Sequence, residues 1–69
     1  MAIVNHVKKY REEKEISQED LGQAVGVSRQ TIYAIEKGNY NPTLELSFKL
    51  AIFFDKTIEE LFSYRGEAR

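Results

Sequence analysis

Residues 17–37, SQEDLGQAVGVSRQTIYAIEK, constrain the fold more than any other part of the chain, because two helical patterns follow each other there with almost no linker. Ser17 and Ser28 each stand where a hydroxyl can accept a hydrogen bond from an amide of the first turn that follows. Gly26 comes directly after the first pattern, where a glycine ends a helix in the left-handed conformation at little cost. These residues predict two short helices joined by a tight turn, which is a helix-turn-helix.

Apolar residues recur at helical spacing through both of these helices and predict one buried seam. The seam consists of Leu21, Val25, Val27, Ile32 and Ile35. On the second helix the residues left facing outward are polar and long, and they are Arg29, Gln30, Tyr33 and Lys37. The second helix is therefore predicted to carry a contact surface.

A chain of 69 residues has room for one small hydrophobic core and none for a deep catalytic cleft. We predict a single domain over residues 1–64 and a disordered tail over residues 65–69, since the closing sequence SYRGEAR is mostly polar. The lack of Cys excludes disulfides and thiolate metal sites and fits a reducing compartment. Helix packing must then supply nearly all of the stability.

The rest of the chain predicts three more helices and no strand. The first covers about residues 3–14, and the second covers residues 44–54 with Thr43 as its N-cap. A short last helix is capped by Thr57, with Glu60 completing a Thr-x-x-Glu capping box. Glu15 lies in a link without glycine, and a left-handed conformation there would cost about 1 kcal/mol. The predicted fold is a compact all-α bundle of five helices.

The predicted helix over residues 44–54 has apolar side chains on every face, which a helix in so small a domain can hardly bury alone. A second copy of the chain would cover the excess, so we expect a homodimer. The predicted dimer residues are Phe48, Ile52, Phe53, Phe62 and Tyr64. The alternative is that these side chains only cover the core of the monomer, where scattered exposed apolar groups are normal.

The overall charge balance gives a nucleic-acid partner no support, because 10 basic and 11 acidic residues leave a formal net charge of −1. The distribution of the charges is more informative. From residue 22 to residue 40 the only acid is Glu36, against Arg29 and Lys37, while the acids cluster on either side of this range. A locally basic face on an otherwise acidic body is therefore predicted.

Catalysis is not expected from this sequence, and neither is a metal or an organic cofactor. The chain has one histidine, His6, no Cys and no glycine-rich phosphate loop, so it lacks a nucleophile with a base and an orienting group. His6 has no acid at metal-ligand spacing and is expected to be solvated. No run approaches the length of a membrane span and the N-terminus lacks a signal-peptide pattern, so a cytoplasmic location is expected.

Several motifs taken together resemble one family. They are REEK followed by ISQEDLG, a small residue at Gly22, Gly26 in the turn, SRQTIYAIEKG, YNPTLELSFKLA and FDKTIEELF. Over residues 7 to about 64 the chain resembles the short Cro/repressor-type regulators of bacteria and phages, also called the xenobiotic-response-element type. The resemblance implies a five-helix, lambda-repressor-like domain with the helix-turn-helix at helices 2 and 3. It also implies a homodimer that binds operator DNA with helix 3 in the major groove.

Carried over position by position, the resemblance implies a role for each outward residue. Base edges would be read by Arg29, Gln30, Tyr33 and Ala34. The DNA backbone would be contacted by Gln18, Ser28, Lys37, Asn39, Tyr40 and Asn41. Arg11 and Glu36 match a pair that in many relatives forms an ion pair between the first and third helices.

Simpler roles stay open for five of these residues, and two of them, Arg29 and Gln30, could be ordinary solvated surface residues. Tyr33 could pack against Asn39 and Tyr40, Lys37 could serve only the helix dipole, and Gln18 could be an ordinary first-turn residue. The expected function is that of a sequence-specific, DNA-binding transcriptional regulator, most naturally a repressor, with no small-molecule effector. The alternative is a protein-interaction module, antitoxin-like or an anti-regulator, that keeps the helix-turn-helix as a scaffold, and the net acidic charge supports it.

Overall fold

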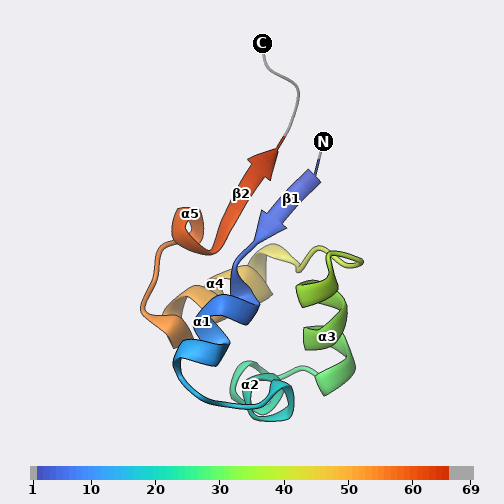
Figure 1. The fold of residues 1–69 in the computed structure, drawn as a ribbon, viewed down its shortest axis with the longest axis vertical. Coiled ribbons are helices and arrows are strands. Elements are labelled where there is room, and N and C mark those ends of the chain that lie inside the picture. The colour runs from blue at the N-terminus through green and yellow to red at the C-terminus, as the bar shows by residue number, and fades with distance from the viewer. Residues whose placement is uncertain (1, 66–69) are drawn as a thin grey trace.

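The computed structural model describes residues 2–65, which form five helices and two short strands (Figure 1). In chain order these elements are β1 (Ala2–Asn5), α1 (Val7–Glu13), α2 (Gln18–Val25), α3 (Arg29–Lys37), α4 (Leu44–Phe54), α5 (Ile58–Leu61) and β2 (Phe62–Arg65). The helices form a compact bundle. The two strands run antiparallel and extend together from one end of the bundle, which brings both ends of the described chain to the same side (Figure 1).

The helix boundaries agree with the capping residues predicted from the sequence. The four predicted N-caps each accept a hydrogen bond from the amide three residues further on, and they are Ser17, Ser28, Thr43 and Thr57. The capping box is also present, because the Glu60 carboxylate accepts a hydrogen bond of 2.8 Å from the Thr57 amide. Gly26 ends α2 at a φ of 81°, in the predicted left-handed conformation. Glu15, with a φ of 59°, adopts the left-handed conformation, for which the expected cost is about 1 kcal/mol.

The prediction of no strand was wrong. Residues predicted to begin the first helix at Ile3 lie in β1, and Arg65, the first residue of the predicted disordered tail, lies in β2. Ala2 pairs with Arg65 and Asn5 pairs with Phe62. A pairing between residues so far apart in sequence leaves no local pattern, so neither short segment alone could indicate its partner. Residues 66–69 of the predicted tail lie outside the described residues.

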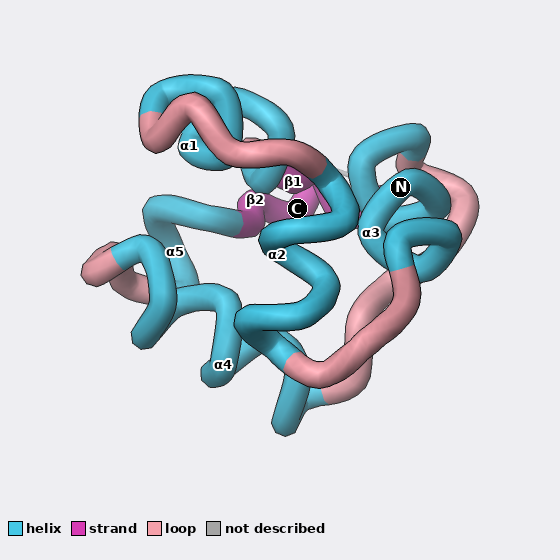
Figure 2. The backbone as a smooth tube through the Cα atoms, turned by 90° about the horizontal axis from the view of Figure 1, so that it is seen from below, coloured by secondary structure: helices cyan, strands magenta, loops and turns pink. Residues whose placement is uncertain are grey.

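The core is one continuous cluster to which every helix contributes. Its buried members are Val7, Leu21, Val25, Ile32, Ile35, Leu46, Leu50, Ala51, Phe54 and Leu61. The seam predicted for the paired helices is confirmed, with Val27 packed against this cluster as a half-buried member. Figure 2 views the molecule from the end opposite the strands, where α2 packs against α3 and α4.

The longest helix, α4, is also the one that leaves most apolar surface uncovered. Leu44, Phe48 and Ile52 follow one another at four-residue spacing and are all exposed, Leu44 by 72% and Ile52 by 78%. We call these three residues the α4 strip. Within residues 2–65 none of the helices has the length and apolar character needed to cross a membrane.

Candidate nucleic-acid interface

The outward face of α3 carries the residues that the sequence predicted for it. Arg29, Gln30, Tyr33 and Lys37 are exposed, and Ala34 is half-buried between them and the core. The opposite face of the same helix is fully buried through Ile32 and Ile35, which fixes the direction in which the polar residues point. The structure therefore brings the predicted base-reading residues together on one solvent-facing surface.

Lys37 and Tyr33 lie one turn apart on this surface and contact each other. The Lys37 ammonium lies 5.9 Å from the centroid of the Tyr33 ring, within range of a cation–π interaction. The pair presents an exposed aromatic ring next to a positive charge. Such a pair can meet a sugar or a base while its charge neutralises a phosphate.

Two loops border α3 and carry most of the remaining predicted residues. At the start, the Ser28 hydroxyl accepts a hydrogen bond from the Thr31 amide at 3.2 Å and lies 3.1 Å from the Thr31 hydroxyl. At the end, Gly38 turns the chain at a φ of 84°, and Asn39, Tyr40 and Asn41 follow it as exposed residues. The predicted backbone-contacting residues thus lie at both ends of α3.

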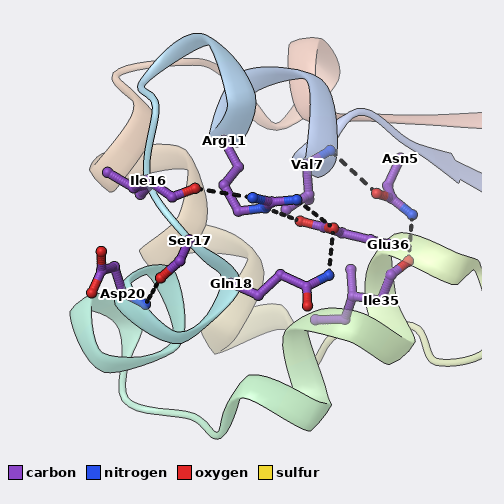
Figure 3. Close-up of polar contacts among 9 residues, drawn as sticks. All are labelled: Asn5, Val7, Arg11, Ile16, Ser17, Gln18, Asp20, Ile35 and Glu36. Atoms are coloured by element: carbon purple, nitrogen blue, oxygen red, sulfur yellow. Dashed lines mark hydrogen bonds and ion pairs between the residues drawn. The ribbon is translucent and has the colours of Figure 1, made fainter.

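Glu36 is the one acid of α3, and its carboxylate is turned away from this surface. It accepts a hydrogen bond from Arg11 Nε at 2.7 Å and a second from Arg11 Nη2 at 3.2 Å (Figure 3). Its side chain is 4% exposed and that of Arg11 is 12% exposed. The predicted ion pair between the first and third helices is confirmed. The exposed face of α3 is left with basic and neutral side chains.

The electrostatics of this pair keep Arg11 charged. The pKa of Arg11 is raised above its usual value, mainly by the hydrogen bond to Glu36, while burial acts in the opposite direction. A raised folded-state pKa of a base adds stability below its unfolded-state pKa and loses it only as the pH rises through the higher value. For an arginine this window covers the whole ordinary pH range. Arg11 also donates to the Ile16 carbonyl at 2.9 Å.

Gln18 joins the same network, which the sequence did not indicate. Its side-chain amide donates to Glu36 Oε1 at 3.0 Å, and Figure 3 shows the amide nitrogen pointing toward the ion pair. The carboxylate of Glu36 therefore binds α1 through Arg11 and α2 through Gln18. The phosphate contact predicted for Gln18 stays a prediction, and its side-chain nitrogen already has a partner inside the protein.

Asn5 is a second residue that sequence reasoning missed. Its side-chain amide donates to the Ile35 carbonyl at 2.7 Å, and its carbonyl oxygen accepts from the Val7 amide at 3.2 Å. The sequence predicts one helix over residues 3–14, in which Asn5 is an ordinary position with neither the spacing of a core residue nor the place of a cap. Its neighbour His6 is half-buried and not fully solvated, and the backbone amide of His6 donates to the Leu61 carbonyl at 2.8 Å.

The predicted dimer residues divide into two groups. Phe48, Ile52 and Tyr64 are exposed, whereas Phe53 and Phe62 are half-buried and pack against the core. Leu44 was not predicted, yet it is exposed together with Phe48 and Ile52 on the α4 strip. Leu44 also borders a shallow groove lined by Ile3, Asn41, Pro42, Leu44, Ser47, Ile58 and Phe62. The apolar surface available to a partner therefore runs along α4 from Leu44 to Ile52, with Tyr64 exposed on β2.

Comparison with known proteins places this architecture in a family. The helix-turn-helix family profile matches residues 7–61. An HTH-type transcriptional regulator of Methanocaldococcus jannaschii is 52% identical over 63 residues, covering 91% of this chain and 96% of that protein. The cryptic phage CTXphi transcriptional repressor RstR, from Vibrio cholerae, is 39% identical over 57 residues, covering 83% of this chain and 51% of RstR.

A solved structure has the same fold. The crystal structure of the restriction-modification controller protein C.AhdI from Aeromonas hydrophila matches with a TM-score of 0.75 and 33% sequence identity, covering 83% of each chain. These relatives are regulators, so the prediction that the chain is not an enzyme is confirmed. The chain belongs to the Cro/repressor-type helix-turn-helix family of DNA-binding transcriptional regulators.

Proposed function

We propose that the chain binds a specific operator in the cytoplasm and represses transcription by occupying a promoter, with α2 and α3 as the helix-turn-helix and α3 in the major groove. One observation carries this proposal. The only acid of α3, Glu36, is neutralised by Arg11 inside the protein, so the exposed face presents Arg29 and Lys37 without an opposing charge. A locally positive surface of this kind attracts the DNA backbone even when the whole chain is slightly acidic.

Base reading is assigned to the first two turns of α3. Arg29 can donate two hydrogen bonds to a guanine, and Gln30 can pair with an adenine in the same bidentate way. Tyr33 lies one turn further on, and Ala34 can meet a thymine methyl group. The exposure of Arg29, Gln30 and Tyr33 on one face supports this assignment.

Backbone contacts are assigned to the two ends of α3 and to the start of α2. At the C-terminal end, Lys37 and the residues that follow can contact phosphates on one side of the groove, and these residues are Asn39, Tyr40 and Asn41. At the other side, Ser28 and the first-turn amides of α2 near Gln18 can contact the opposite strand.

Removing Arg29 and removing Lys37 should affect DNA binding differently. For Arg29→Ala we expect the binding free energy for the preferred site to weaken by about 1–3 kcal/mol and the preference for one base pair to relax. The reason is that the two hydrogen bonds from the guanidinium group to a base are lost. For Lys37→Ala we expect all sequences to bind more weakly, because one phosphate contact is lost. The slope of the logarithm of the binding constant against the logarithm of the salt concentration should become shallower by about one. Fluorescence anisotropy over a salt series, on duplexes selected from a random pool, measures both.

Lys8→Ala is the matched control, because it removes the same charge from an exposed position on α1. Its affinity should stay close to that of the unchanged protein. An equal loss on every sequence from Arg29→Ala would refute the base-reading role.

The homodimer is proposed to form through the α4 strip and the groove beside it. Two copies related by a two-fold axis would place their α3 helices about 34 Å apart, one turn of DNA between half-sites. Leu44→Glu should convert the dimer to a monomer, because it places a charge on the α4 strip at the end that lines the groove. Folding should not suffer, since Leu44 is 72% exposed and an acid in the first turn of a helix is favourable.

Sedimentation equilibrium measures this change against the 8.0 kDa mass of one chain. Lys8→Glu, at an exposed position on α1 that borders neither the α4 strip nor the groove beside it, is the control and should leave the dimer intact. A dimer that survives Leu44→Glu would place the interface elsewhere, and an unchanged protein that is monomeric at every concentration would end the homodimer proposal.

A second candidate function is protein interaction without DNA binding, and the net charge of −1 together with the exposed α4 strip favours it. The salt series separates the two functions. A steep fall in affinity for duplex DNA with rising salt supports the regulator. No binding to any duplex at low salt would favour the interaction module.

A further inference from the structure

The Asn5 side chain joins two helices that are not adjacent in sequence. Its Nδ2 donates to the carbonyl of Ile35 in the last turn of α3 at 2.7 Å (Figure 3). Its Oδ1 accepts from the amide of Val7, the first residue of α1, at 3.2 Å. His6, the N-cap residue of α1, makes no capping bond with its side chain. One amide therefore serves both the start of α1 and the end of α3.

The carbonyl that Asn5 contacts lies where the chain leaves α3. The last carbonyls of a helix lack partners within the helix and are satisfied by the residues that follow or by side chains. Here Gly38 donates to the Ile35 carbonyl at 3.0 Å and Asn39 donates to the Ala34 carbonyl at 2.9 Å. The Asn5 amide adds a third donor to this junction. These three hydrogen bonds hold the backbone at the point where residues 38–41 leave α3.

Asn5 is itself held by the strand pair. It is the last residue of β1 and pairs with Phe62 of β2, and the next residue, His6, donates to the Leu61 carbonyl at 2.8 Å. The neighbouring residue on α3, Glu36, is bound by Arg11 of α1 and Gln18 of α2. The last turn of α3 is thus attached to α1 by Arg11 and to α2 by Gln18. Among these bonds, only the one from Asn5 attaches it to the strands.

We infer that Asn5 is a positioning residue for DNA binding. Its side-chain donor holds the last turn of α3 and residues 38–41 in the geometry that contacts the DNA backbone, and it links that geometry to the pairing of β1 with β2. Asn5 itself touches no DNA in this arrangement. The inference rests on the proposed function.

Asn5→Asp isolates the donor. The variant keeps the size of the side chain and the acceptor for Val7, but it turns a charged oxygen toward the Ile35 carbonyl in place of the N–H group. Asn5→Ala removes both bonds without adding charge. Gln23→Glu is the matched control, because it makes the same amide-to-carboxylate change at an exposed position of α2.

Two measurements are made on the full chain at a temperature where each variant is fully folded. The first is affinity for the duplex that the unchanged protein selects from a random pool, or for a random-sequence duplex at low salt if none is selected. The second is hydrogen exchange of the Gly38 and Asn39 amides, which are both hydrogen-bonded to α3. For Asn5→Asp we expect an affinity about tenfold lower and exchange of these two amides about tenfold faster, with Asn5→Ala changing in the same direction. Gln23→Glu should change neither.

The outcomes separate this inference from the proposed function. If both Asn5 variants bind DNA as tightly as Gln23→Glu and differ only in thermal midpoint, Asn5 merely stabilises the fold and the inference is overturned. If the unchanged protein binds no duplex, the proposed function fails, and hydrogen exchange alone decides the role of Asn5. Faster exchange confined to Gly38 and Asn39 then supports only the statement that Asn5 holds the end of α3 in place, while uniform or unchanged exchange overturns that statement as well.

Discussion

Replacing Glu36 with alanine is expected to lower the free energy of unfolding by about 3–5 kcal/mol, because the change leaves the Arg11 guanidinium buried without its counter-charge. Arg11 is 12% exposed and keeps its bond to the Ile16 carbonyl, which cannot replace a carboxylate. The Gln18 amide also loses its acceptor. A domain of this length has a total stability of about 3–10 kcal/mol. The change should therefore remove about a third or more of the total stability, and urea denaturation followed by far-ultraviolet circular dichroism measures the loss.

A double-mutant cycle separates the stranded charge from lost packing. Arg11→Met alone strands the Glu36 carboxylate, which is 4% exposed, whereas Arg11→Met combined with Glu36→Ala leaves neither charge. The double variant should therefore be more stable than the sum of the single losses predicts, by about 1–3 kcal/mol. Purely additive losses would show that the two residues stabilise the fold independently.

Replacing Gly22 with valine should cost about 3 kcal/mol or more, at the upper end of the range for overpacking. A Cβ atom added to Gly22 would lie 2.6 Å from the carbonyl oxygen of Val27 and 3.2 Å from the backbone of Ser28. These are backbone atoms of the turn between α2 and α3, so no side chain can move aside. The Val27 amide also donates to the Gly22 carbonyl at 2.8 Å, which keeps the two segments close.

The expected consequence is a shift of α3 away from α2, with loss of DNA binding in any molecules that still fold. Gly22→Ala should show a smaller loss. Its methyl group meets the same backbone atoms, but it lacks the two further methyl groups of valine, and alanine favours the helix. Gln23→Val is the matched control at the next, exposed position and should cost less than about 1 kcal/mol. Thermal denaturation of the three variants ranks them, and equal midpoints for Gly22→Val and Gln23→Val would contradict the close approach of the turn.

Local signals in the sequence were sufficient for the last four helices and for the surface of α3, but not for the start of α1. Ser17, Ser28, Thr43 and Thr57 cap the helices as predicted, because a cap depends on residues three positions apart. The outward residues of α3 were predicted from the spacing of Ile32 and Ile35, since burial of one helix face decides the other. The ion pair of Arg11 with Glu36 was predicted only through the family resemblance, because its two residues lie 25 positions apart.

The exposed apolar surface was predicted only in part. The composition of α4 indicated that some apolar side chains stay uncovered, and Phe48 and Ile52 are among them. Phe53 instead packs against the core, and its ring lies 5.1 Å from that of Phe54 in an edge-to-face arrangement. Because α4 has apolar residues on every face, its sequence did not indicate which face would be buried. Only the packing of the neighbouring helices decided which of these residues remain exposed.

By itself, therefore, the sequence determined the last four helices with their N-caps, the presence of α1, the left-handed Gly26 that ends α2 and the polar face of α3, since each of these depends on neighbours within one or two turns. The tertiary structure alone decided the pairing of β1 with β2, the use of Gln18 as a third partner in the ion pair, and the bond from Asn5 to Ile35. These features join residues 18 to 30 positions apart or, in the strands, opposite ends of the described chain. Hydrogen bonds of that kind form only after the core has brought their partners together, so no local pattern in the sequence records them.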